Sequence, residues 1–99
     1  MVPREVRAMG LSWYLEKDYG RILKIMEDAD KLPATYGQWR SSAERGERGL
    51  KDKGHIVVRA IIDPEEFAAW CRERALKLDA NGRIAFASWV ALQQVKNTH

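Results

Sequence analysis

The chain has 99 residues, of which 45% are hydrophobic and 31% charged, a composition typical of one folded, water-soluble domain rather than a disordered chain. The net charge of +3 is too small to predict a nucleic-acid partner by itself. A single cysteine, Cys71, excludes an intramolecular disulfide, and no apolar run approaches the roughly 18 residues of a membrane span, so we expect no membrane partner.

The first residues carry no structural signal. Residues 1–12 show no hydrophobic periodicity, and we expect a poorly ordered tail there, followed by a single helical domain over residues 13–99. This start lacks the apolar core of a signal peptide, which favours a cytoplasmic location. Met9 is a second candidate start residue, and the sequence does not decide between it and Met1.

Two helices are predicted next. The first begins near Ser12 and ends before Pro33, because proline disfavours helical geometry at the preceding residue. The second begins with a capping box, in which Thr35 is the cap and Gln38 follows three residues later. Its distal half, ERGERGLKDKG, is charged and contains two glycines, so we expect that half to be exposed and frayed.

A β-branched run, IVVRAII at residues 56–62, predicts a strand. Both faces of the strand are largely apolar, and no second convincing strand is evident, so its backbone groups need a partner from elsewhere. We expect it to pair antiparallel with the same strand of a second copy, in a homodimer. The alternative is a short strand folded against an irregular segment of its own chain.

The third helix has the clearest start. Asp63 can accept hydrogen bonds from the first-turn N–H groups, and Pro64 fits the first helical position. Phe67, Trp70 and Cys71 follow helical spacing and predict the inward face. We therefore interpret Cys71 as a small buried apolar side chain rather than a nucleophile.

The last helix is predicted to begin at Asp79, although Asn81-Gly82 also fits a turn. Its apolar residues cover a wide arc, so we expect it to be buried on two sides, against its own domain and against a partner. Two apolar stripes are predicted side by side. The first consists of Ile84, Ala87, Ser88, Ala91 and Val95, and the second of Phe86, Trp89, Val90 and Gln93.

These elements predict a mainly α (α+β) fold in the order α-α-β-α-α, with one central strand that pairs with its copy across a twofold axis. The predicted dimer interface combines apolar residues of the strand and of the last helix. They are Ile56, Val57, Val58, Ile61, Phe86 and Trp89.

No catalytic or cofactor motif is present. The strong metal ligands are His55, His99 and Cys71, and their spacing matches no metal-binding motif. Nucleophilic catalysis needs a base beside the nucleophile, and His55, the only candidate, fits better as a strand-edge residue. The sequence therefore predicts no cofactor, no metal and no enzymatic activity.

A basic run follows the start of the second helix, with acidic residues interspersed. Mixed charge of this kind is typical of a solvated helix face, and a phosphate-binding surface is the alternative interpretation. The candidate nucleic-acid-binding residues are Arg40, Arg45, Arg48, Lys51, Lys53 and Arg59.

Two stretches, LPATYGQW at residues 32–39 and IDPEEFAAWC at residues 62–71, resemble a family of small, uncharacterised bacterial proteins with LPATxxxW and IDPxxFxxWC patterns. This resemblance covers the chain from about Trp13 onward and implies a bacterial origin without an activity. Residues 55–96 also resemble the ribbon-helix-helix layout, whose members commonly bind DNA with paired strands in the major groove. Of the four outward positions that layout gives, Val57 and Ile61 are apolar and cannot read base edges through hydrogen bonds.

Two functional hypotheses follow from the sequence. The first is a non-enzymatic homodimeric interaction module, assembled through the strand and the last helix. The alternative is a DNA-binding regulator of ribbon-helix-helix type, in which Arg59 and the basic run contact the phosphates.

Overall fold

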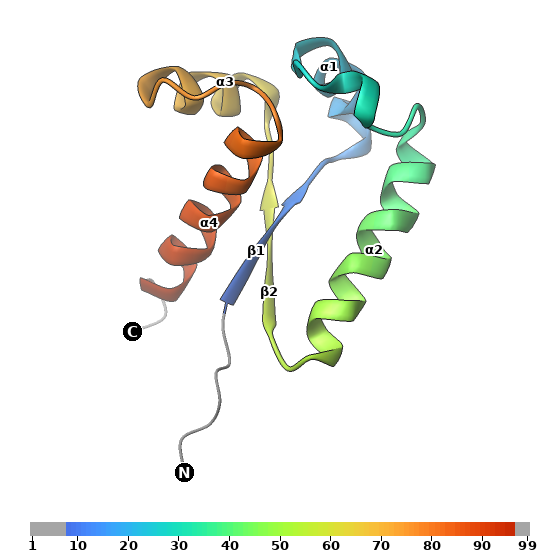
Figure 1. The fold of residues 1–99 in the computed structure, drawn as a ribbon, viewed down its shortest axis with the longest axis vertical. Coiled ribbons are helices and arrows are strands. Elements are labelled where there is room, and N and C mark those ends of the chain that lie inside the picture. Colours follow the sequence, from blue (N-terminus) through green and yellow to red (C-terminus); the bar gives the residue numbers. More distant parts are fainter. Residues whose placement is uncertain (1–7, 97–99) are drawn as a thin grey trace.

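The computed structural model describes the fold of residues 8–96, with side chains as far as Gln94. Within this range the protein is mainly helical and contains one small sheet, as Figure 1 shows. Short 3-10 turns, Glu16–Asp18 and Ala29–Lys31, flank the first helix. The order is β1 (Ala8–Trp13), α1 (Tyr19–Ile25), α2 (Tyr36–Asp52), β2 (Ile56–Ile61), α3 (Pro64–Glu73) and α4 (Ala80–Lys96).

The two strands run parallel, with Ala8 opposite Ile56 and Trp13 opposite Ile61. Parallel strands need a crossover connection, and the segment that contains α1 and α2 supplies it. The N–H of Ile62 donates to the carbonyl of Trp13 at 2.9 Å. In a pleated strand the backbone groups of alternate residues point to opposite edges, so the odd-numbered residues of β2 direct theirs away from β1.

The two long helices cover opposite faces of the sheet, and α1 and α3 close one end of the molecule (Figure 1). On one face, α4 approaches β1 very closely. A Cβ atom added to Gly10 would lie 2.0 Å from the carbonyl oxygen of Ala87, so only glycine permits this approach. The hydroxyl of Ser12 donates to the carbonyl of Arg83 at 3.4 Å on the same face.

On the other face, α2 contacts the sheet through aromatic rings. Trp13 meets Trp39 with ring centroids 5.1 Å apart in an edge-to-face arrangement, a geometry that aromatic pairs prefer. Tyr14, Tyr19 and Tyr36 complete the cluster, with neighbouring centroids 4.7 to 6.2 Å apart. The hydroxyls of Tyr19 and Tyr36 donate to main-chain carbonyls at 2.6 and 3.0 Å, which satisfies polar groups in this apolar region.

The three helix starts that were predicted from capping residues are confirmed, because each cap makes its expected hydrogen bonds. A side-chain oxygen of the cap accepts from first-turn N–H groups at 3.0 to 3.2 Å in all three cases. Asn81 and Gly82 therefore lie in the first turn of α4 and not in a separate turn. The capping pairs are Thr35 with Gln38, Asp63 with Glu65 and Glu66, and Asp79 with Gly82.

The prediction of a tail without structure over residues 1–12 is wrong from Ala8 onward, and residues 1–7 lie outside the described part of the chain. The strand that was not predicted, β1, alternates small residues with large ones. Gly10 faces α4, whereas Trp13 faces α2. The order α-α-β-α-α therefore lacks a first strand, and one edge of β2 pairs within its own chain. The mainly helical α+β class is confirmed.

Two helix predictions also need correction. The first helix was expected from about Ser12 to Leu32, but α1 spans only Tyr19–Ile25, because the residues before it complete β1 and the loop. The charged half of α2 was expected to fray, yet the helix continues to Asp52. Gly54 then adopts φ +90° and ends the helix, a conformation in which glycine carries no steric cost.

Candidate interaction surface

The outer face of α4 exposes large apolar side chains. Ile84 is 64% exposed, Leu92 51% and Trp89 40%. The opposite side of the helix carries Ala87 and Ala91, which are buried against the sheet. Helices of monomeric proteins normally turn their large apolar residues inward, whereas α4 buries Phe86 and exposes three others. We define the α4 outer face as Ile84, Ala85, Ser88, Trp89 and Leu92.

The α4 outer face carries no charge. Residues 84–94 contain no charged side chain. Arg83 precedes them, but it is buried and makes a bidentate ion pair with Asp28, with both N–O distances 2.8 Å. The hydrogen bonds from Arg83 lower the pKa of Asp28, and those to Asp28 raise the pKa of Arg83, so both groups stay charged and neutralise each other. Arg83 thus points into the molecule and ties α4 to the loop after α1.

Trp89 is held in place from the side by α3. Its ring centroid lies 5.9 Å from that of Trp70 and 6.2 Å from that of Phe86. The guanidinium of Arg74 lies 4.2 Å from the Trp70 ring centroid and 5.9 Å from that of Trp89. The indole N–H of Trp70 is buried without a hydrogen-bond partner in the described part of the chain. These contacts leave Trp89 ordered yet exposed, which favours binding because little side-chain freedom is lost.

A second exposed surface runs along β2. Among the described residues the sheet has only two strands, so the edge of β2 away from β1 has no strand beside it. The backbone groups of Val57, Arg59 and Ile61 point to that edge, as the pleat requires. Two apolar side chains of this strand are exposed, Ile56 at 58% and Ile61 at 43%.

Arg59, at the middle of that edge, is engaged within the chain. Its guanidinium binds Glu47 of α2 through two hydrogen bonds of 2.7 and 2.8 Å and lies 3.9 Å from the Trp13 ring centroid. The hydrogen bonds from Arg59 lower the pKa of the Glu47 carboxyl. Glu47 was expected on the exposed half of α2, but it is buried, because Arg59 neutralises its charge against the sheet.

The structure separates the six predicted interface residues into three groups. Ile56, Ile61 and Trp89 are exposed, and Val57 and Val58 are half-buried. The sixth, Phe86, belongs to the core.

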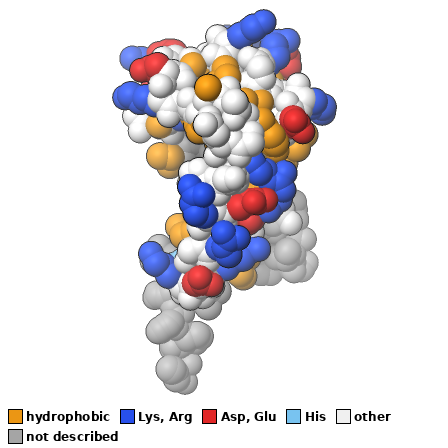
Figure 2. Space-filling model, turned by 90° about the vertical axis from the view of Figure 1, so that its right-hand side faces the viewer, with side chains coloured by type: hydrophobic (Ala, Val, Ile, Leu, Met, Phe, Trp, Pro, Cys, Tyr) orange, Lys and Arg blue, Asp and Glu red, His pale blue; other side chains and the backbone are white. Residues whose placement is uncertain are grey.

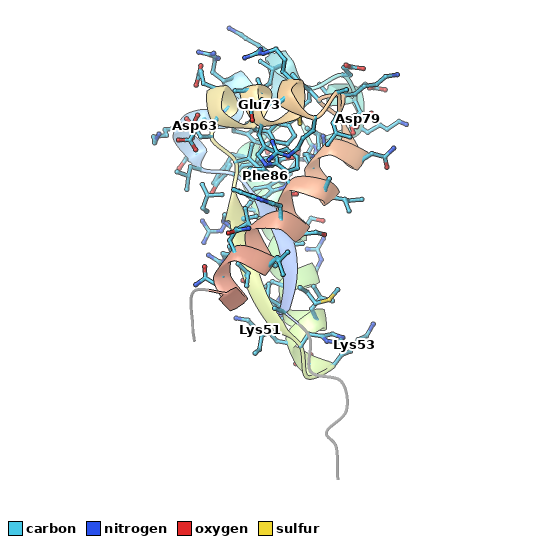
Figure 3. The ribbon with its side chains drawn as sticks, turned by 90° about the vertical axis from the view of Figure 1, so that its left-hand side faces the viewer. Lys51, Lys53, Asp63, Glu73, Asp79 and Phe86 are labelled. Atoms are coloured by element: carbon cyan, nitrogen blue, oxygen red, sulfur yellow. The ribbon has the colours of Figure 1, made fainter. Side chains whose placement is uncertain are left out.

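Phe86 packs edge-on against Phe67 and Trp70, with centroids 5.5 and 5.2 Å away, beneath α3 in Figure 3. Placing it at the surface was therefore a misassignment. The sequence pattern placed Ile84 in one of two apolar stripes without indicating which stripe faces the sheet, and it left Leu92 outside both. The signal that identifies them is the absence of charge over residues 84–94, because an exposed helix face normally carries charged residues.

The candidate nucleic-acid-binding residues do not form one free basic surface. Arg40 pairs with Glu44 at 2.9 Å, as Arg59 does with Glu47. The other four, Arg45, Arg48, Lys51 and Lys53, are exposed. Figure 2 shows basic and acidic side chains interspersed on the α2 side of the molecule, as expected for a solvated face.

The ribbon-helix-helix layout stays a prediction for residues 55–96. The strand and the two following helices are present, but β1 occupies one edge of the strand. Arg59, the outward cation on which base or phosphate contact depended, is bound to Glu47. These contacts reduce the support for a DNA-binding role.

The described part of the chain brings no set of potential metal ligands together. No group of three or more His, Cys, Asp or Glu residues there is placed to hold a metal ion, and His99 lies outside it. Cys71 is fully buried, and burial raises the pKa of its thiol. Burial likewise raises the pKa of Tyr14 to about 12. None of the helices in this part is long and apolar enough to span a membrane.

No protein-family model matches this chain, and comparison with curated proteins and with solved structures found no significant similarity either.

Proposed function

We propose that this protein is an interaction module that assembles with a second copy of itself and acts through binding rather than catalysis. The observation that carries the proposal is the α4 outer face, where three large apolar side chains are exposed and no charged side chain is present. Interface cores are depleted of charged residues and enriched in tryptophan, as this face is. Exposed apolar side chains that cluster on one face are typical of protein contact sites.

The net charge of the chain favours α4 over the other faces for contact between identical copies. Each copy carries +3, so contact through the α2 side brings like charges together. In a twofold dimer each patch meets its own copy, and an uncharged patch meets no repulsion there. The residues of the α4 outer face meet that condition, although the guanidinium of Arg74, at the end of α3, lies 5.9 Å from the Trp89 ring centroid.

The free edge of β2 is a second surface through which two copies could form a dimer. Two copies paired antiparallel along this edge would form a four-stranded sheet, which is more stable than a two-stranded one. A twofold axis at Arg59 places two guanidinium groups side by side, and like charges directly opposite each other destabilise a sheet. The α4 outer face carries no such cost, and we therefore favour it.

The proposal is tested by placing one charge on each surface. Leu92→Glu puts an uncompensated carboxylate within the proposed contact, and Ile61→Glu does the same at the β2 edge. Ser41→Glu, on the exposed side of α2, is the matched control. Light scattering gives the mass of each variant, and circular dichroism checks that each is folded.

The expected result is a dimer for the unmodified chain, for Ser41→Glu and for Ile61→Glu, and a folded monomer for Leu92→Glu. A folded Leu92→Glu dimer contradicts the α4 contact. If Ile61→Glu alone gives a monomer, the dimer forms through the β2 edge. An unmodified chain that is monomeric at every concentration overturns the proposal as a whole.

A further inference from the structure

The α4 outer face contains a ridge with a repeated spacing. Ile84, Ser88 and Leu92 follow one another at intervals of four residues, and all three are exposed. With a rise of about 1.5 Å per residue, Ile84 and Leu92 lie roughly 6 Å from Ser88 in opposite directions along the helix. The ridge therefore has a large side chain, a small one and a large one in turn, and this order is the same in both directions along the helix.

We propose that two copies pack α4 against α4 in antiparallel orientation, with Ser88 at the twofold axis. This inference rests on the proposed function and specifies its geometry. Ser88 then meets Ser88 of the second copy, and Ile84 of each copy meets Leu92 of the other. A small residue at the crossing point lets the helix axes approach to about 8 Å, which is at the short end of the usual range of interaxial distances. The larger side chains on both sides of the crossing point can then pack together.

The orientation follows from the uneven charge of the two ends of the molecule. Figure 3 shows Lys51 and Lys53 at one end and Asp63, Glu73 and Asp79 at the other. The asymmetry extends beyond the labelled side chains. Residues 48–58, at the end of α2 and the start of β2, carry three basic side chains and one acidic one, whereas residues 14–35 and 62–83 together carry eight basic and ten acidic ones.

Antiparallel packing of α4 brings the basic end of each copy beside the acidic end of the other, because α4 runs lengthwise between the two ends (Figure 1). Parallel packing instead places the two basic ends together. The dipoles of the two helices add to the same preference, since antiparallel dipoles attract. The charge distribution and the uncharged ridge therefore point to one geometry.

The twofold position is tested by disulfide trapping. Ser88→Cys places two thiols at the axis, within the Cα separation of about 4.4 to 6.8 Å that a disulfide needs. Ser41→Cys on α2 is the matched exposed control, and the unmodified chain shows what the buried Cys71 contributes. Under mild oxidation, Ser88→Cys should cross-link roughly tenfold faster than Ser41→Cys, because association holds its thiols together.

The orientation is tested by mixing two further variants. Antiparallel packing predicts that Ile84→Cys and Leu92→Cys cross-link to each other in a mixture more than either does alone. Parallel packing predicts the opposite, because each residue would then meet its own copy. Mass spectrometry of the dimer band distinguishes the mixed species from the two homodimers.

The outcomes separate this inference from the proposed function. If the unmodified chain is a dimer but Ser88→Cys cross-links no faster than Ser41→Cys, the antiparallel contact is wrong and the self-association stands. If Ile84→Cys and Leu92→Cys each prefer their own copy, the orientation is wrong. A monomeric unmodified chain overturns both.

Discussion

Helices α2 and α4 are both 17 residues long and lie on opposite faces of the same two strands, yet their surfaces differ. The sequence of α2 contains seven charged residues, whereas that of α4 contains two, Arg83 and Lys96. α2 contacts the sheet through Trp39 and the buried Glu47. α4 contacts it through small residues at very short range and exposes Ile84, Trp89 and Leu92 on its outer side.

This difference fits the proposal that α4 makes two contacts, one with its own sheet and one with a second copy. The inner contact of α4 needs only small residues, because Gly10 lets the helix backbone reach the strand. Large side chains at Ile84 and Leu92 are then not needed for the fold of one copy. They have a physical role if the outer face packs against another molecule, whereas the charged outer face of α2 is already stable in water.

The largest expected effect comes from Gly10→Ala, which breaks the close contact on the α4 side. The added methyl group would overlap the Ala87 carbonyl, so α4 must shift, at a cost of about 3 kcal/mol or more. Gly46→Ala is the matched change on α2, where an added Cβ meets nothing within 4 Å. It should stabilise the protein by about 1 kcal/mol. Urea unfolding measures both, and equal effects of the two variants would contradict the difference between the helices.

The next largest effect is expected for Asp28→Asn, which removes the charge that neutralises Arg83. A buried cation left without its carboxylate costs about 2 to 3 kcal/mol here, below the value for a fully buried pair because Asp28 keeps some solvent contact. Thermal unfolding at pH 7 measures the loss. An unchanged midpoint would mean that the pair does not fasten α4.

The same pair predicts a dependence on acid. The pKa of Asp28 is lowered in the folded protein, so its contribution to stability is complete above the pKa of the unfolded chain, about 4. The contribution is lost as the pH falls through the lowered folded-state pKa. The unmodified chain should therefore lose more free energy of unfolding than Asp28→Asn between about pH 5 and about pH 2. Unfolding curves of both proteins, recorded at these two pH values, measure the difference.

The smallest effect is expected for Glu47→Gln, the corresponding change on the α2 side. Its ion pair with Arg59 is lost, but Arg59 is 40% exposed and water replaces part of the interaction. A loss of about 1 kcal/mol follows, with the Trp13 contact retained. Urea unfolding of Glu47→Gln and Asp28→Asn compares the contributions of the two ion pairs to stability. A larger loss of stability for Glu47→Gln would contradict the expectation that the Arg83–Asp28 pair contributes more.

Local chemistry made part of the fold predictable. Thr35, Asp63 and Asp79 each accept hydrogen bonds from their own first turn, so the capping residues alone locate three helix starts. The strand β2 follows from its β-branched run. These features depend on residues a few positions apart, and such signals are visible without the tertiary structure.

The first strand and part of the interaction surface depend on distant contacts. Gly10 resembles a loop residue in the sequence, and its role appears only when Ala87 lies against it. With β1 unrecognised, β2 lacked a partner and its pairing was assigned to a second copy. Phe86 was assigned to the interface although it lies in the core, and the exposure of Ile84 was not foreseen, because apolar spacing does not tell which side of a wide apolar arc faces the sheet.

The central claim is that the α4 outer face holds two copies together, and the mass of the unmodified chain in solution tests it most directly. Sedimentation equilibrium over a concentration series gives that mass without a label or a substitution. We predict a rise from the 11.4 kDa of one chain towards twice that value as the concentration increases. A mass of 11.4 kDa throughout the series would contradict the claim.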